Sequence, residues 1–188
     1  MATPQDAMIS HRLVLHPSDP MTAPQSTQAL VQGLALSGLI GDVYPQGGEY
    51  AFFSGAEFLQ LISFLGCSPH MALLPGESED PGFCYVSLTA IKAWPKFILG
   101  QHPATSRCPN CSSPAVDWQN NMDPGSIHVC TSCEIKSPIH ALNWKRSAGY
   151  GRVFIEIYGV HPHEAVPADH LLESLHTAHG IAWDYCYL

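Results

Sequence analysis

Charged residues are scarce in this sequence. Asp, Glu, Lys and Arg make up 13% of the 188 residues, about half the usual fraction in a soluble protein. Apolar residues make up 46%, yet no stretch approaches the roughly eighteen uncharged apolar residues of a membrane-spanning helix. The N-terminal stretch lacks the basic start and apolar run of a signal peptide. We therefore expect a cytoplasmic protein that contacts no membrane.

Three common catalytic motifs are also missing from the sequence. It has no Gly-rich phosphate loop, no Gly-x-Ser-x-Gly elbow and no His-Glu-x-x-His, which would have indicated nucleotide, acyl-transfer or zinc-peptidase chemistry. Their absence gives no reason to name a reaction, and it leaves open whether the protein is an enzyme.

The net charge of −8 is distributed unevenly along the chain. Residues 107–152 carry a net charge of +2, from five Lys and Arg against three Asp and Glu, whereas the segments before and after carry −5 each. A mostly acidic surface repels a nucleic-acid backbone. Any contact with nucleic acid should therefore be local to residues 107–152.

Four of the seven cysteines form two closely spaced pairs, Cys108/Cys111 and Cys130/Cys133. Two intervening residues allow both sulfurs of a pair to face the same ion, and the eighteen residues between the pairs fall in the range typical of zinc sites. An odd number of cysteines suits a reducing compartment better than a disulfide framework. The spacing therefore predicts a metal site with four cysteine ligands.

The segment from Cys108 to Cys133 resembles a zinc ribbon. The resemblance implies a structural Zn²⁺, because four cysteines leave no coordination position open for chemistry, although iron suits the same ligand set. Many ribbon turns have Gly after the second cysteine, whereas this sequence has Ser112 and Glu134 there. We expect Arg107 and Lys136 to offset the negative charge of the thiolates. We expect His128 and His140 to be surface or packing residues.

The pattern of apolar residues and turns predicts an α+β fold, with helices packed on a mixed sheet. An α+β domain is expected from residues 1–104 and 147–188, with residues 105–146 as an inserted zinc-ribbon-like module. Ser54 and Glu57 match a capping box and predict a buried helix over 54–66. The other expected elements are helices over 27–39 and 168–180, a hairpin of 40–44 with 49–53, and strands over 11–17, 83–91, 152–160 and 181–188.

The two ends of the sequence look alike. Each has an apolar stretch ending in His-Pro, a Pro-containing loop, a Leu-rich helix and a Gly, followed four positions later by Asp42 or Asp184. This similarity could reflect a duplicated β-α-β unit. It could equally arise in any pair of strand-loop-helix-strand units.

Two further groups of residues could form a second functional site. The loop at 161–170 contains His161, His163, Glu164, Asp169 and His170. Imidazole and carboxylate groups can bind a second metal or act as acid and base, and His11 and His16 would join them if the end strands were neighbours. Alternatively, this is a polar loop whose acids cap the following helix. A Cys67/His70 pair could be a nucleophile and its base, or two packing residues.

A basic and aromatic stretch follows the second cysteine pair. It contains Trp144, Lys145, Arg146, Tyr150 and Arg152, side chains favoured in protein contacts and also able to hold nucleic acid. Alternatively it is a linker with flexible glycines. The preferred hypothesis is a zinc-binding adaptor that presents this surface to a protein partner. The alternatives are an enzyme or metal-handling protein that uses 161–170, and local nucleic-acid binding.

Overall fold

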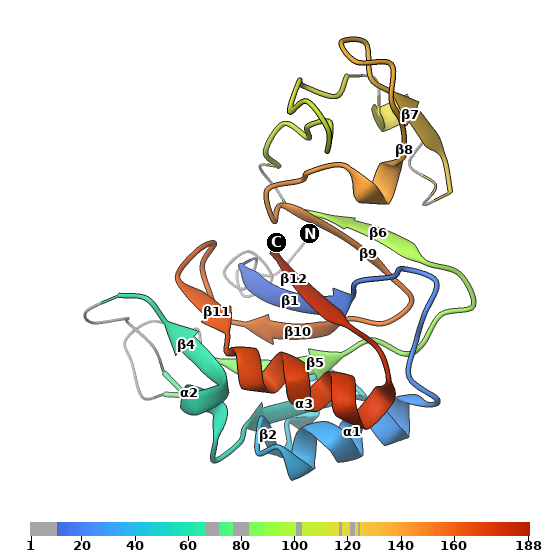
Figure 1. Ribbon diagram of the computed structural model, residues 1–188. Coiled ribbons are helices and arrows are strands. Elements are labelled where there is room, and N and C mark those ends of the chain that lie inside the picture. Colours follow the sequence, from blue (N-terminus) through green and yellow to red (C-terminus); the bar gives the residue numbers. More distant parts are fainter. Residues whose placement is uncertain are drawn as a thin grey trace, which may run out of the picture.

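The main element of the fold is a six-stranded sheet in the order β12-β1-β10-β5-β3-β2 (Figure 1). The computed structural model describes residues 11–66, 72–76, 83–100, 103–116, 118–120, 123 and 125–188. Neighbouring strands of the sheet are all antiparallel, so the expectation of a mixed sheet is wrong. The strands are β1 (Arg12–Pro17), β2 (Ile40–Val43), β3 (Ala51–Ser54), β5 (Tyr85–Leu88), β10 (Ile155–Tyr158) and β12 (Trp183–Tyr187).

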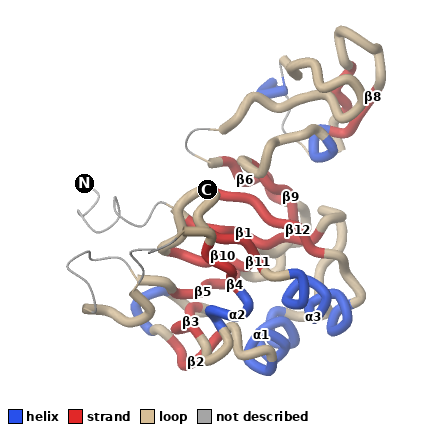
Figure 2. The backbone as a smooth tube through the Cα atoms, turned by 60° about the vertical axis from the view of Figure 1, so that its left-hand side comes forward, coloured by secondary structure: helices blue, strands red, loops and turns tan. Residues whose placement is uncertain are grey.

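Helices α1 (Thr27–Leu36) and α3 (Asp169–His179) cover one face of this sheet (Figure 2). The Ser26 side chain accepts a hydrogen bond from the first turn of α1, and Gly180 ends α3 with a φ of 67°, which glycine adopts at little cost. The apolar sides of both helices pack against the inward-facing residues of the strands in one large core. Within the described residues, no helix is long and apolar enough to cross a membrane.

The helix predicted over 54–66 is wrong in extent. The chain forms one helical turn, α2 (Phe58–Leu61), and then strand β4 (Ile62–Phe64), which pairs with β11 (Ala165–Pro167). The Ser54 hydroxyl donates to the carbonyl of Cys84 instead of capping the helix. Pairing with β11, distant in sequence, therefore overrides the local helix signals. The hairpin of β2 and β3, joined through a 3₁₀ turn (Pro45–Gly47), is confirmed.

A two-stranded ribbon, β6 (Lys96–Leu99) with β9 (Ala148–Gly151), lies against the other face of the sheet (Figure 1). Gly149 is a buried residue of β9, not part of a flexible linker. A Cβ at this position would lie 2.8 Å from Cδ2 of His16 and 3.1 Å from Sγ of Cys186. The backbone of β9 can therefore approach the sheet this closely because residue 149 has no side chain.

The segment that holds the two cysteine pairs leaves the two-stranded ribbon after β6 and returns to it at β9 (Figures 1 and 2). It contains the hairpin of β7 (Ile127–Val129) and β8 (Lys136–Pro138), with 3₁₀ turns at Trp118–Asn120 and Ile139–Ala141. Its apolar cluster also includes Phe97 of β6 and Tyr150 of β9. We refer to residues 105–146 as the cysteine module.

The strands that flank α1 and α3 can be compared to examine the suggested β-α-β repeat. Strands β1 and β2 run parallel to each other with three strands between them, whereas β10 and β12 run parallel with β1 alone between them. In both units the two strands run in the same direction, but the number of strands between them differs. The internal duplication stays a prediction.

Replacement of Gly149 by Ala should destabilise the protein. The new methyl group would meet His16 and Cys186, and such overpacking typically costs about 1–3 kcal/mol. Urea denaturation of Gly149→Ala would measure the loss in the free energy of unfolding. The control is Gly66→Ala, because a Cβ at Gly66 meets nothing within 4 Å. Equal effects of the two substitutions would contradict the close approach of β9.

Candidate metal centre

The structure brings the four predicted cysteine ligands together. The Sγ atoms of Cys108 and Cys133 are 3.7 Å apart, those of Cys111 and Cys130 are 3.6 Å apart, and all four lie within 4.8 Å of one another. Sulfurs of a tetrahedral zinc site, with bonds of about 2.3 Å, are about 3.8 Å apart. A disulfide would bring two of them to about 2.05 Å, and all four cysteines are free. The arrangement is compatible with a bound metal ion.

Each cysteine pair lies in a turn with the same backbone hydrogen bonds. In the first turn, the N–H of Cys108 donates to the carbonyl of Ser113 at 2.9 Å, and the N–H of Ser112 donates to the carbonyl of Cys108 at 3.0 Å. The second turn repeats them, from Cys130 to Ile135 at 3.0 Å and from Glu134 to Cys130 at 2.9 Å. The two halves of the site are therefore built alike.

The residue after the second cysteine of each turn has a left-handed backbone. Ser112 has a φ of 61° and Glu134 a φ of 59°, a conformation that costs a residue other than Gly roughly 1–2 kcal/mol. The absence of Gly at these positions does not prevent the turn geometry. It stores strain in both turns.

Hydrogen bonds to the sulfurs favour the thiolate form in the first turn. The side chain and backbone of Ser113 lower the pKa of Cys111 to about 6, and the backbone N–H of Cys111 lowers the pKa of Cys108. Hydrogen bonds from Ile135 and Asn110 favour the Cys133 thiolate, but burial and the neighbouring thiols outweigh them and raise its pKa to about 11. Backbone N–H groups aimed at sulfur suit metal-bound thiolates.

The side chain of Arg107 donates to a backbone carbonyl of the first turn and not to a cysteine sulfur. Its Nη1 donates to the carbonyl of Ser112 at 2.8 Å, and its backbone pairs with Asn143 in both directions, at 2.9 and 2.8 Å. Arg107 thus ties the metal turn to the chain that returns to β9. Lys136 lies opposite Val129 in the hairpin, and its predicted role in offsetting thiolate charge stays a prediction.

Trp144 is 6% exposed, so it is not part of an exposed docking surface as we expected. Its ring packs 4.7 Å from that of Trp118 and 5.2 Å from that of Phe97, and its Nε1 donates to the carbonyl of Ile139. Phe97 in turn stacks on Tyr150 at 4.4 Å. These rings form the apolar base on which the cysteine module rests.

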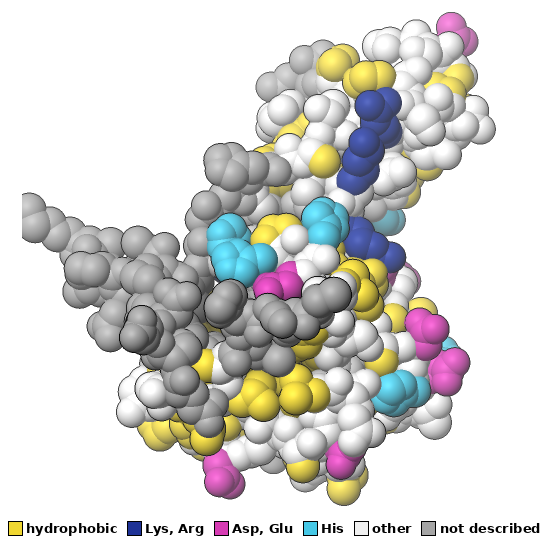
Figure 3. Space-filling model, turned by 90° about the vertical axis from the view of Figure 1, so that its left-hand side faces the viewer, with side chains coloured by type: hydrophobic (Ala, Val, Ile, Leu, Met, Phe, Trp, Pro, Cys, Tyr) yellow, Lys and Arg dark blue, Asp and Glu magenta, His cyan; other side chains and the backbone are white. Residues whose placement is uncertain are grey.

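The predicted basic surface is largely engaged within the protein. Arg146 donates to the Asp184 carboxylate at 2.8 Å, and its guanidinium lies 3.6 Å from the centre of the Tyr185 ring. Arg152 donates to the backbone carbonyls of Lys92 and Met21. Figure 3 shows Lys and Arg side chains aligned where the cysteine module meets the body, next to several His side chains.

The histidine-rich loop gives no second metal cluster within the described residues. The rings of His161 and His11 are 4.7 Å apart, as expected for neighbouring end strands. His163 packs against Tyr187, and Glu164 accepts a hydrogen bond from the backbone of His161. The loop is therefore held by its own turn and by aromatic contacts. Its predicted use as a second site stays a prediction.

Two of the cysteines outside the metal turns, Cys84 and Cys186, are buried, and burial raises the pKa of each to about 12. The predicted Cys67/His70 pair lies outside the described residues. His11 directly precedes β1, whereas His16 lies near the other end of that strand, where it pairs with Asp184, so His16 does not join the loop.

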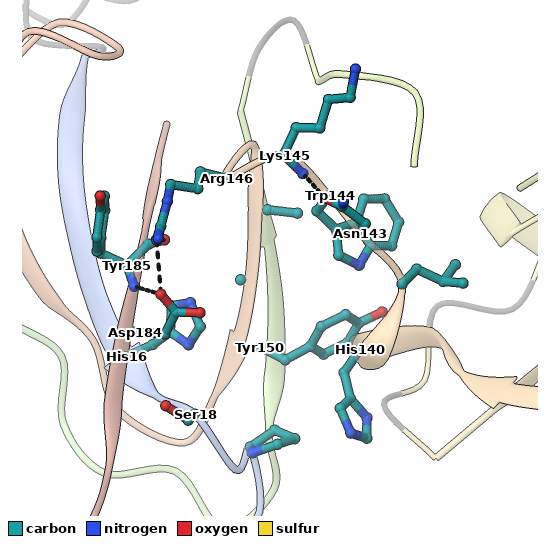
Figure 4. Close-up of a pocket in the computed structure, with 14 residues that line it drawn as sticks. His16, Ser18, His140, Asn143, Trp144, Lys145, Arg146, Tyr150, Asp184 and Tyr185 are labelled. Carbon is teal, nitrogen blue, oxygen red and sulfur yellow. Dashed lines mark hydrogen bonds and ion pairs between the residues drawn. The ribbon is translucent and has the colours of Figure 1, made fainter. Parts of the chain in front are cut away.

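A cavity of about 440 Å³, which the sequence did not predict, lies between the sheet edge and the cysteine module (Figure 4). His16 and Ser18 lie on one side, next to Asp184 and Tyr185 of β12, and Tyr150 lies within the cleft. These residues come from segments far apart in sequence. One indication of the cavity was present in the sequence. Both ends of the chain contain a His-Pro pair and an Asp, and His16 and Asp184 are among these residues.

Comparison with known proteins does not place the chain in a family. No protein-family model matches it, and no curated protein or solved structure matches it either. The resemblance to a zinc ribbon therefore rests on the four cysteines and on the two matching turns that hold them.

The four cysteines should hold one divalent metal ion per chain. Inductively coupled plasma mass spectrometry of the purified protein would measure the stoichiometry, with a value near zero expected for Cys108→Ser plus Cys130→Ser. The double variant His161→Ala plus His163→Ala should retain the full equivalent. A second metal ion per chain that is present in the unmodified protein and lost in His161→Ala plus His163→Ala would indicate that the loop also binds metal.

Glycine at both left-handed positions should make the metal turns more stable. Ser112→Gly plus Glu134→Gly removes the strain of two positive φ angles, a gain of up to about 1 kcal/mol per site after the entropy cost of glycine. Slower transfer of the bound metal to a chelating dye would show this gain. The control is Thr131→Gly in the second turn, which should only destabilise. Faster metal loss from Ser112→Gly plus Glu134→Gly would contradict the role of strain.

Proposed function

We propose that the protein is a zinc-stabilised adaptor. In this proposal the four cysteines hold a structural Zn²⁺, and the hairpin of β7 and β8 binds a protein partner. The α+β body serves as the scaffold from which the cysteine module projects (Figure 1).

Zinc is proposed because of the donor set and its spacing. Four thiolates, with sulfurs 3.6 and 3.7 Å apart in two pairs, suit a tetrahedral ion that prefers sulfur. Four protein ligands fill that shell and leave no position for a substrate or water. The ion would therefore rigidify the module, and a rigid surface loses less entropy when it binds a partner.

The observation that carries the proposal is the exposed apolar surface of the hairpin. Ile127 is 56% exposed, Val129 is 50% exposed and the adjacent Ile135 is 41% exposed. Ile127 and Val129 are two residues apart on one strand and so face the same side, while Ser137 is buried on the other. Apolar side chains gathered on a metal-rigidified hairpin are typical of a contact surface.

A protein partner fits this surface better than nucleic acid does. Lys136 lies opposite Val129, so a partner with apolar and acidic side chains would match the hairpin. Nucleic acid would require several free cations, but Arg146 and Arg152 are bound to Asp184 and to backbone carbonyls.

Site-specific photocrosslinking in cells would test the adaptor. A photoreactive amino acid at Val129 should give one discrete product with a different protein, because the side chain would be covered by the partner. The same amino acid at Leu36, which is 89% exposed on α1 of the body, is the matched control. The Val129 product should disappear when Cys111 and Cys133 are replaced by Ser.

Three results would contradict the adaptor. The first is no product from Val129, and the second is the same products from Val129 and Leu36. The third is a product with twice the mass of the chain, which would indicate self-association instead.

A further inference from the structure

The cavity between the sheet and the cysteine module has the size of a small-molecule site. Its volume of about 440 Å³ falls in the range of ligand pockets, about 300–1,000 Å³. One wall carries polar groups of β1 and β12, the opposite wall belongs to the cysteine module, and β9 lies between them (Figure 4). Junctions between two parts of a chain are frequent ligand sites.

The turn at the top of this cavity is strained. Lys145 and Arg146 are consecutive residues with φ angles of 49° and 60°, a conformation that costs roughly 1–2 kcal/mol per residue. The turn is held by hydrogen bonds from the backbone of Lys145 to Oδ1 of Asn143 and from Tyr187 to the carbonyl of Arg146. Strain of this kind gathers at ligand sites. Here it aims the Arg146 side chain at Asp184, while Lys145 points away (Figure 4).

Among the described residues, the two charged side chains that point toward the cavity, Arg146 and Asp184, form an ion pair with each other. Oδ1 of Asp184 accepts from Nη1 of Arg146 at 2.8 Å and from the backbone N–H of Tyr185 at 2.8 Å. No hydrogen bond from the residues that the structure describes reaches Oδ2 of Asp184. An anionic ligand would meet Asp184 and a cationic ligand would meet Arg146, so neither charge is favoured. The ligand that suits this balance is neutral.

His16 supplies a second free acceptor beside Asp184. Its Nδ1 lies 3.0 Å from the carbonyl oxygen of Pro17, and a carbonyl accepts only, so Nδ1 carries the proton. Burial lowers the pKa of His16 below its usual 6.5. The ring is therefore neutral at pH 7, and Nε2 offers a lone pair. Among the described contacts, Nε2 has no hydrogen bond.

Donors and an apolar wall complete the lining. The Ser18 hydroxyl and the Asn143 side-chain amide can donate, and Tyr150 and Leu142 supply a wall against which carbon atoms can pack. A hydroxyl group both donates and accepts. Several hydroxyls on one small molecule would thus satisfy His16, Asp184 and the donors together.

We propose that this cavity binds a small, neutral polyhydroxylated molecule of the sugar or polyol class, whose hydroxyl groups donate to His16 and Asp184. Such a ligand matches the mixture of donors and acceptors without disturbing the ion pair of Arg146 and Asp184. This site is separate from the exposed hairpin proposed to bind a protein partner.

NMR titration of the full-length, zinc-loaded protein would test the cavity. The neutral probes are glycerol, myo-inositol, D-ribose, D-glucose, D-galactose and N-acetyl-D-glucosamine, compared with propylamine and acetate as charged probes. At least one neutral probe should give saturable shifts of the backbone amides of Gly149 and Tyr185. No saturable shift from any neutral probe, or stronger binding of propylamine or acetate, would overturn the proposal.

Two variants separate hydrogen bonding from simple occupancy. His16→Phe keeps a ring but removes the acceptor, so affinity for the neutral probe should fall about tenfold. Asp184→Asn leaves the charge of Arg146 unbalanced, so acetate should begin to bind while the neutral probe weakens. The control is Asp42→Asn on β2, an exposed carboxylate far from the cavity. Unchanged affinities in both cavity variants would overturn the assignment.

Discussion

The contact between the backbone of β9 and the outer face of the sheet joins the two parts of this protein. Gly149 rests against His16 and Cys186 at distances that leave no room for a side chain. From this contact the chain runs back through the strained turn at Lys145 and Arg146 to the aromatic base of the cysteine module. The direction in which the module projects, and the cavity between module and sheet, both follow from it.

Local patterns in the sequence were sufficient for much of the fold. Apolar runs located the end strands, and the helices expected over 27–39 and 168–180 match α1 and α3 to within a few residues. The failure at residues 54–66 has a physical reason, because the capping signals act within one turn, whereas β4 forms by pairing with β11 about a hundred residues later. Strand pairing over such separations leaves no trace in a local pattern. The antiparallel order of the sheet was missed for the same reason.

The candidate sites also differ in whether local sequence determines them. The four cysteines could be predicted because each pair is local and the chemistry of thiolates fixes their use. The surface around Trp144 was misjudged because burial depends on distant partners such as Phe97 and Trp118. The cavity was missed because His16, Asn143 and Asp184 meet only after β1 pairs with β12 and β9 docks on the sheet.

The pairing of Arg107 with Asn143 connects the metal turn to the cavity wall. Arg107 precedes the first cysteine, and Asn143 holds the backbone of Lys145 through its side chain at 3.0 Å. Whatever order a metal ion imposes on Arg107 therefore extends to the rim of the cavity. Thermodynamic linkage is reciprocal, so a ligand that favours the ordered rim would also raise the equilibrium affinity of the four cysteines for the metal. The amount of free metal around the protein would then set how readily the cavity fills.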